Sequence, residues 1–253
     1  MHTNKNIASI LVKLALIIGV IIGVWASLVQ DGFYDPSHFL YYTIQSNLEM
    51  GIISLVCLFF LFRKKGQIPQ SVYLLKFIFT VAISLTGFVF NFILYPESVI
   101  YNYYLNPFST SNFFTHIFVP VLSIVDFFIF DYKMKITNKT FFLGLITPLL
   151  YFAFVMICTV TGIRFYKEGF VPYFFLDYKQ YGWFTLGTDI FGVFYWIILQ
   201  IILVLFISFF LIFFLKKRKK NTWFLTDNEQ NINSEEKWKL QIILNTLVLM
   251  TTK

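Results

Sequence analysis

A threonine and a histidine in two separate apolar segments of this 253-residue chain are the residues best suited to do chemistry together. The imidazole of His116 can take the proton of the Thr43 hydroxyl, and the resulting oxygen can attack an acyl carbonyl. Three polar neighbours, Ser46, Asn47 and Asn91, can donate hydrogen bonds to the oxyanion that such an attack creates. These residue types predict an acyl-transfer site, with Thr43 and His116 catalytic and the other three binding substrate.

Each of these residues also has a structural interpretation. A threonine in a membrane helix commonly bonds the carbonyl four residues before it, and a membrane histidine can hold two helices together. Thr43, Asn91 and His116 each lie three or four residues inside the same expected boundary, about 5 to 6 Å from it. That shared depth favours a common site, but a reactive site and a packing cluster both remain open.

Six apolar blocks must position these side chains. Hydrophobic residues make up 58% of the chain and charged residues 13%, and the mean hydropathy is +0.71, which excludes a soluble globular protein and a disordered chain. A helix of about 20 apolar residues crosses the ~30 Å hydrocarbon core. The blocks are 7–29, 39–62, 72–95, 113–130, 140–163 and 190–215. The sequence therefore predicts an all-α fold, a polytopic bundle of six transmembrane helices.

The cations between the blocks predict the orientation of the bundle. The connections at 63–71 and 131–139, the residues 216–220 and Lys5 together supply twelve Lys and Arg residues, whereas the alternate connections supply three. The positive-inside rule then places both termini in the cytoplasm of a multi-pass protein of the cell membrane, with Thr43 and His116 near the outer surface. The same distribution accounts for the net charge of +7, so nucleic acid is not expected as a partner.

The chain is expected to comprise a transmembrane domain at 1–215 and a basic cytoplasmic tail at 216–253. The apolar run at 240–250 is about half a membrane thick and predicts a short helix on the inner surface. Gly19 and Gly23 form a G-x-x-x-G pair that lets a neighbouring helix approach closely. The sequence contains no G-x-S-x-G elbow, zinc-binding H-E-x-x-H or phosphate-binding glycine loop, so neither a metal nor a cofactor is expected.

Other charged side chains inside the blocks need partners, because charge is costly in hydrocarbon. Lys76 and Asp126 lie at similar depth near the inner ends of antiparallel segments, and we expect a buried ion pair between them in preference to a functional carboxylate. Glu49 lies near mid-membrane with no cation at its depth. A hydrogen-bonded carboxyl is favoured there over a proton path, since one carboxylate does not make a relay.

The long connection at 164–189 contains ten aromatic residues. An aromatic belt at the membrane interface accounts for most of them. The segment is also placed to cap the level of Thr43 and His116 and to shield a lipid ester from water. Asp177, in its middle, can orient His116 through the second ring nitrogen.

An ordered set of motifs resembles a known family. The string YYTIQSN at 41–47, the H-x-x-x-P at 116–120 with Asp126 beyond it, and PYFFLDYKQYG at 172–182 resemble the bacterial Pr6Pr family of six-helix membrane proteins. That family is similar to the animal androgen-induced-gene and androgen-dependent TFPI-regulating membrane proteins. The resemblance covers residues 1 to about 215 and implies a threonine hydrolase that cleaves fatty acid esters of hydroxy fatty acids. It implies a threonine nucleophile at Thr43 and a histidine partner at His116, and it gives no chemical role to Asn47, Asp126 or Asp177.

The leading hypothesis is an integral membrane hydrolase of fatty-acyl esters. Membrane lipids are then the partners, and an acyl chain reaches Thr43 laterally from the outer leaflet. The rival hypothesis is a non-enzymatic membrane protein, either a small-solute transporter or a scaffold, whose polar cluster serves binding or packing.

Overall fold

The computed structural model describes residues 2–30, 32–63, 67–101, 105–131, 133–165, 169–187 and 191–219. Within this part of the chain, six helices are long and apolar enough to cross a membrane. They are Asn6–Leu28, Tyr42–Phe62, Gln70–Ile100, Thr110–Phe130, Thr140–Thr161 and Val193–Lys219. Each overlaps one of the six apolar blocks, so the all-α polytopic fold is confirmed, and the chain is a multi-pass membrane protein. The helix expected at 240–250 lies outside the described residues.

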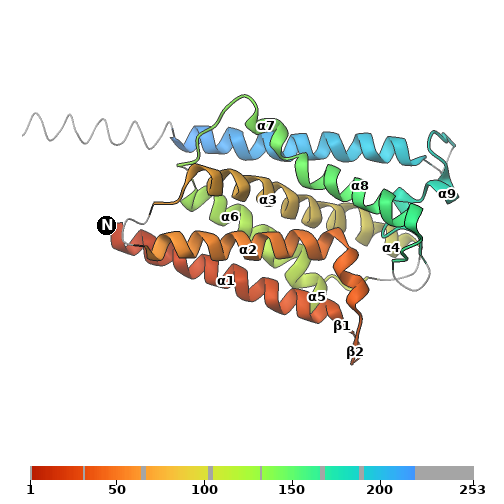
Figure 1. The fold of residues 1–253 in the computed structure, drawn as a ribbon, viewed down its shortest axis with the longest axis horizontal. Helices are drawn as coiled ribbons and strands as arrows, with labels where there is room; N and C mark the ends of the chain where they lie inside the picture. Colours follow the sequence, from red (N-terminus) through yellow and green to blue (C-terminus); the bar gives the residue numbers. More distant parts are fainter. Residues whose placement is uncertain are drawn as a thin grey trace, which may run out of the picture. The chain divides into compact units, whose positions relative to one another are not determined.

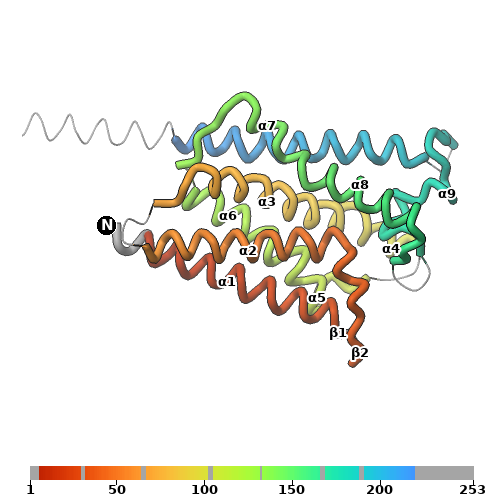
Figure 2. The backbone as a smooth tube through the Cα atoms, in the orientation of Figure 1, coloured from red at the N-terminus to blue at the C-terminus, as the bar shows by residue number. Residues whose placement is uncertain are grey.

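The backbone shows how the spans are assembled from shorter elements (Figures 1 and 2). In chain order the elements before the last span are α1 His2–Leu28, β1 Val29–Gln30, β2 Phe33–Tyr34, η1 Pro36–Leu40, α2 Tyr42–Phe62, α3 Gln70–Val89, η2 Phe90–Leu94, α4 Tyr95–Ile100, α5 Thr110–Phe113, η3 Phe114–Phe118, α6 Val119–Phe130, α7 Thr140–Leu143, α8 Ile146–Thr161, η5 Phe174–Leu176 and α9 Tyr178–Tyr181. The strands β1 and β2 form a two-residue antiparallel hairpin. The third span is α3, η2 and α4 in succession and the fourth is α5, η3 and α6, with η2 and η3 both π-helical.

Four helices form the centre of the first of two compact units, which ends at Ile212. The helix α1 packs against α2 and α6, and α3 packs against the same two helices, so the four surround one core (Figure 1). That core includes Leu16 of α1, Met50 of α2, Ile83 of α3 and Val119 of α6. The outward faces also carry exposed apolar side chains, as expected where lipid covers a helix.

The glycine pair of α1 packs within the chain. A Cβ atom at Gly23 would lie 2.9 Å from side-chain atoms of Phe114 and Thr115, and one at Gly19 would lie 2.8 Å from the ring of Phe118. Only glycine therefore permits the approach between α1 and η3. This contact fixes one side of the π-helix that carries His116.

A buried network of charged side chains joins three helices. Lys13 of α1 donates to Asp126 of α6 at 2.9 Å and to Ser9 at 3.0 Å. Lys76 of α3 also donates to Asp126, and it forms a second ion pair with Asp131. The predicted pair between Lys76 and Asp126 is confirmed, and it belongs to a larger group in which two lysines balance two aspartates. Because a buried charge that loses its partner costs about 3–5 kcal/mol, each member depends on the others.

Candidate active site

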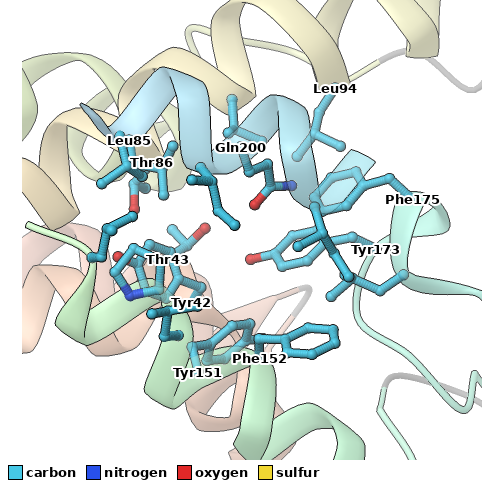
Figure 3. A pocket seen from close by; sticks show the side chains of 18 of the residues that line it. Tyr42, Thr43, Leu85, Thr86, Leu94, Tyr151, Phe152, Tyr173, Phe175 and Gln200 are labelled. Atoms are coloured by element: carbon cyan, nitrogen blue, oxygen red, sulfur yellow. The ribbon is translucent and has the colours of Figure 1, made fainter. Parts of the chain in front are cut away.

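A pocket lies between the first turn of α2 and the last span (Figure 3). Its walls come from α2, α3, η3, α8, the connection at 173–176 and the last span near Gln200. It contains about 780 Å³ of empty space, its open mouth included, within the ~300–1,000 Å³ typical of ligand pockets. Among the described residues that line it, none is Asp, Glu, Lys or Arg. The pocket therefore suits a largely apolar, uncharged ligand.

Thr43 lies on this pocket in the first turn of α2. The helix begins at Tyr42 because Tyr41, which follows the 3-10 helix η1, has an extended backbone with φ −83° and ψ 140°. The N–H groups of a first helical turn have no partners within the helix, and the helix dipole there favours negative charge. The hydroxyl and the N–H of Thr43 thus lie where a developing oxyanion is stabilised.

The connection that follows α8 contributes Tyr173, Phe175 and Leu176 to the lining of the pocket. The phenol of Tyr173 interacts through hydrogen bonding with Thr43 and with Tyr151, and Figure 3 shows it reaching into the pocket. Burial raises the pKa of Tyr173 to about 12, and hydrogen bonding with Thr43 and Tyr151 limits the rise. The phenol is therefore neutral at physiological pH and carries an O–H group.

His116 belongs to the π-helix η3 and lines the same pocket as Thr43. Its ring stacks on that of Phe90, with centroids 3.9 Å apart and planes at 9°, and it hydrogen-bonds the backbone carbonyl of Thr86. The Nδ1 atom is buried and has no hydrogen-bond partner. Because the carbonyl must accept a proton, Nε2 carries it, and the lone pair of Nδ1 is left available to take one from a hydroxyl.

Pro120 explains the backbone around His116. Proline has no N–H, so the His116 carbonyl lacks the donor that an α-helix supplies four residues later. The N–H of Val119 bonds back to the carbonyl of Phe114, which leaves the Thr115 carbonyl without its α-helical donor as well. Two consecutive carbonyls of η3 are thus free to accept hydrogen bonds from neighbouring helices.

Two asparagine side chains fill these two positions. Asn47 Nδ2 donates to the Thr115 carbonyl at 3.2 Å and to the Thr43 carbonyl at 2.7 Å. Asn91 Nδ2 donates to the His116 carbonyl at 3.1 Å, and to the carbonyl four residues before it in its own helix at 2.7 Å. Asn47 therefore connects the two backbones that carry the reactive side chains, and Asn91 connects the backbone of His116 to α3.

The structure places three of the predicted substrate-binding residues outside the pocket lining. Asn47, Asn91 and Ser46 were expected to bind substrate, but none of them lines the pocket. The amides are occupied by backbone carbonyls, and Ser46 Oγ donates to the Thr43 carbonyl at 3.1 Å and shares a 2.7 Å hydrogen bond with Thr86 Oγ1. The three side chains hold Thr43 and His116 in place from behind.

Asp177 also lies outside the pocket lining. Its carboxylate caps the short helix α9 by accepting from the N–H groups of Lys179 and Gln180, at 3.1 and 3.0 Å. It does not line the pocket, and the carbonyl of Thr86 takes the place at the imidazole that an acidic residue was expected to fill.

The structure adds pocket residues that sequence reasoning missed. Gln200 of the last span has a buried Nε2 with no hydrogen-bond partner. Its signal in the sequence is that it is the only amide side chain in the apolar block 190–215. The phenols of Tyr42 and Tyr151 form a fixed wall, because the first shares a 3.2 Å hydrogen bond with Thr147 and the second donates to the Leu40 carbonyl at 3.0 Å.

The site therefore combines a hydroxyl, an imidazole with an unused lone pair and an unpaired amide donor in an apolar pocket. Thr43 and His116 line it together but are not hydrogen-bonded to each other through Nδ1, which has no partner. Within the described part of the chain, no group of three or more His, Cys, Asp or Glu side chains is arranged to hold a metal ion. Comparison with protein-family models, curated proteins and solved structures finds no match to this chain.

Proposed function

We propose that this protein is an integral membrane hydrolase of fatty-acyl esters in which Thr43 is the nucleophile and His116 the base. Two observations carry the proposal: Thr43 and His116 line one apolar pocket, and Nδ1 of His116 has no hydrogen-bond partner. A packing histidine uses both ring nitrogens or buries them against partners, because an unsatisfied buried polar atom costs about 1–3 kcal/mol. General-base catalysis needs such a free lone pair within reach of the hydroxyl that it deprotonates.

The reaction proceeds by two acyl transfers. Nδ1 of His116 takes the hydroxyl proton as Thr43 Oγ attacks the ester carbonyl carbon, and the carbonyl electron pair moves onto oxygen. Collapse of this intermediate breaks the bond to the alcohol oxygen, which leaves with the proton from the imidazolium. Water then attacks the acyl-threonine by the same route and releases a fatty acid. Hydrogen bonding to the Thr86 carbonyl and stacking on Phe90 keep the ring oriented throughout.

The pocket walls support a lipid substrate. Phe152 of α8 and Ile201 and Val204 of the last span continue the apolar lining away from Thr43. Leu149 lines the pocket and is 47% exposed on the outer side of α8. An acyl chain can thus reach Thr43 from the surrounding hydrocarbon. The resemblance to hydrolases of fatty acid esters of hydroxy fatty acids favours the same class of ester, and membrane lipids are then the partners of the protein.

Ester hydrolysis by purified protein in liposomes tests the proposal. Release of free fatty acid from a fatty acid ester of a hydroxy fatty acid should fall to the uncatalysed level in Thr43→Ala and in His116→Ala. The matched controls Thr161→Ala and His38→Ala alter a threonine and a histidine outside the pocket and should keep full turnover.

The rival function predicts a different pattern. Glu49 Oε2 is buried without a hydrogen-bond partner, and its residue does not line the pocket. Solute uptake into liposomes that is lost in Glu49→Gln, with no fatty acid released by the unmodified protein, would replace the hydrolase with a transporter.

A further inference from the structure

Gln200 places an unused donor in an otherwise apolar wall. The last span has little reason to keep an amide there, because an unsatisfied buried N–H is unfavourable and no described protein group bonds its Nε2. A leucine or methionine would fill the same space without that penalty. The two N–H groups of Nε2 therefore suit an acceptor that a ligand brings.

Tyr173 supplies a second donor to the same space. Its phenol is neutral at physiological pH, because burial raises its pKa to about 12, and it carries an O–H group next to Thr43 and Tyr151. Figure 3 shows the polar ends of Tyr173 and Gln200 turned into the pocket in which the Thr43 side chain also lies. The three groups come from the connection, the last span and α2, so they converge only in the folded chain.

We infer that Gln200 and Tyr173 hold the carbonyl oxygen of the bound ester, so that the pocket recognises an acyl ester by its carbonyl and not by its chain alone. This inference rests on the proposed function, whose nucleophile fixes where the carbonyl carbon must lie. When Thr43 Oγ adds to that carbon, the same two donors stabilise the oxyanion, and the helix dipole at the start of α2 favours the negative charge.

The site then has two parts with separate tasks. The nucleophile and the base lie on α2 and η3, whereas both carbonyl donors lie after α8. Neither donor takes part in the hydrogen bonds from Asn47 and Asn91 to the backbone of η3. The carbonyl site can therefore be altered while the position of His116 is preserved.

Binding of two matched lipids to Thr43→Ala protein tests the inference without any turnover. Methyl oleate and oleyl methyl ether differ only in a carbonyl that replaces a CH₂ group, so the ratio of their affinities, measured by thermal-shift titration in detergent, reports the carbonyl site. We expect the ester to bind about tenfold more tightly, the factor that ~1.4 kcal/mol represents. The preference should fall toward one in Thr43→Ala/Gln200→Met and decrease in Thr43→Ala/Tyr173→Phe.

Ser208→Ala is the matched control on the same helix. Ser208 is fully buried, its Oγ also has no hydrogen-bond partner, and it does not line the pocket. Thr43→Ala/Ser208→Ala should therefore keep the full ester preference. An ester preference that survives both the Gln200→Met and Tyr173→Phe changes, or equal binding of ester and ether before either change, overturns the carbonyl site.

Turnover separates this inference from the proposed function. With Thr43 present, Gln200→Met should lower kcat for ester hydrolysis by about 10²–10³-fold, the loss typical of one oxyanion donor, and change KM much less. Full activity in Gln200→Met and Tyr173→Phe, with Thr43→Ala inactive, rejects the carbonyl site and leaves the hydrolase. An ester preference that depends on Gln200 in a protein that never releases fatty acid rejects the hydrolase and leaves a carbonyl-binding pocket.

Discussion

Asn91 Nδ2 donates to the backbone carbonyl of His116 at 3.1 Å, and that carbonyl is available because residue 120 is a proline. The same device occurs in the helix that carries Asn91. Segments 90–96, FNFILYP, and 114–120, FTHIFVP, each form a π-helix that ends just before a proline. In both, the N–H of the residue before the proline bonds the carbonyl of a phenylalanine five positions earlier. Two widened helices thus meet at the candidate active site, as π-bulges often do.

Replacing Asn91 by leucine should lower the turnover of the folded protein as well as its stability. The change leaves the carbonyls of His116 and Gly87 without this donor and should lower the free energy of unfolding by about 1–3 kcal/mol. Without the hydrogen bond to its backbone carbonyl, His116 loses the fixed position of its imidazole. The kcat for ester hydrolysis should therefore fall about tenfold, with a smaller change in KM.

The control for this change is Asn112→Leu, which removes a hydrogen bond to the Asn106 carbonyl outside the pocket. It should leave kcat unchanged. If the folded fraction of Asn91→Leu, measured below its unfolding temperature, hydrolyses ester at the unmodified rate, Asn91 does not position His116.

The buried charge network should be essential for stability and dispensable for chemistry. Asp126→Leu leaves Lys13 and Lys76 with Asp131 alone and should reduce the free energy of unfolding by about 3–5 kcal/mol. Adding Lys13→Met restores a neutral pair of Lys76 and Asp131, so the double variant should be more stable than Asp126→Leu. Thermal unfolding in detergent measures the stability of the single and the double variant. Lys133→Met, which alters an exposed lysine, is the control.

None of the four charged residues lines the pocket, so turnover per folded molecule should not change in these variants. A double variant that is less stable than Asp126→Leu would contradict the charge balance. Loss of turnover in the folded protein would instead give Asp126 a functional role.

Tyr173 should make the protein sensitive to alkaline pH in a defined window. Burial raises the pKa of Tyr173 to about 12, against an ordinary value of about 10. Below pH 10 the phenol is neutral in both the folded and the unfolded chain, so its ionisation does not lower the free energy of unfolding. Between pH 10 and 12 the unfolded chain releases the proton and the folded protein keeps it, so stability falls by about 2–3 kcal/mol.

Thermal unfolding across this pH range measures the effect. Tyr173→Phe should remove that part of the alkaline loss, whereas Tyr34→Phe, at a 58% exposed tyrosine, should not. Identical alkaline profiles for Tyr173→Phe and the unmodified protein would show that the phenol is not held neutral by burial.

The length and placing of the apolar blocks were sufficient to predict the six spans, because a membrane demands about 20 apolar residues for each helix. Counting residues inward from the ends of the blocks also predicted that Thr43 and His116 lie at the same depth. In the structure both residues line one pocket. The pair of Lys76 and Asp126 followed from the same reasoning, since each charge needed a partner at its own depth.

The roles of the surrounding polar residues could not be derived in this way. Helical spacing places Asn47 and Asn91 near the reactive pair but does not say which carbonyls lack donors. The proline four residues after His116 carries that information, and it turns both amides toward backbone. Asp177 has a local signature of its own, a carboxylate just before a helical turn, which is typical of an N-cap.

The role of Gln200 could be recognised only from the tertiary structure, because the last span meets α2 and η3 only in the folded chain. In the sequence it is a single amide among apolar residues, and such a residue can as easily face another helix. Its position on the pocket wall beside Tyr173 and Thr43 is what distinguishes it.

Identification of the residue that a fluorophosphonate modifies tests the central claim most directly. Purified protein in detergent is treated with an alkyl fluorophosphonate, which reacts with hydroxyls activated by a neighbouring base, and the adduct is located by mass spectrometry of the digested chain. We predict a single adduct on Thr43 that His116→Ala abolishes and that His38→Ala leaves at the unmodified level. An adduct on another residue, or labelling of Thr43 at the same rate without the imidazole of His116, would contradict the account.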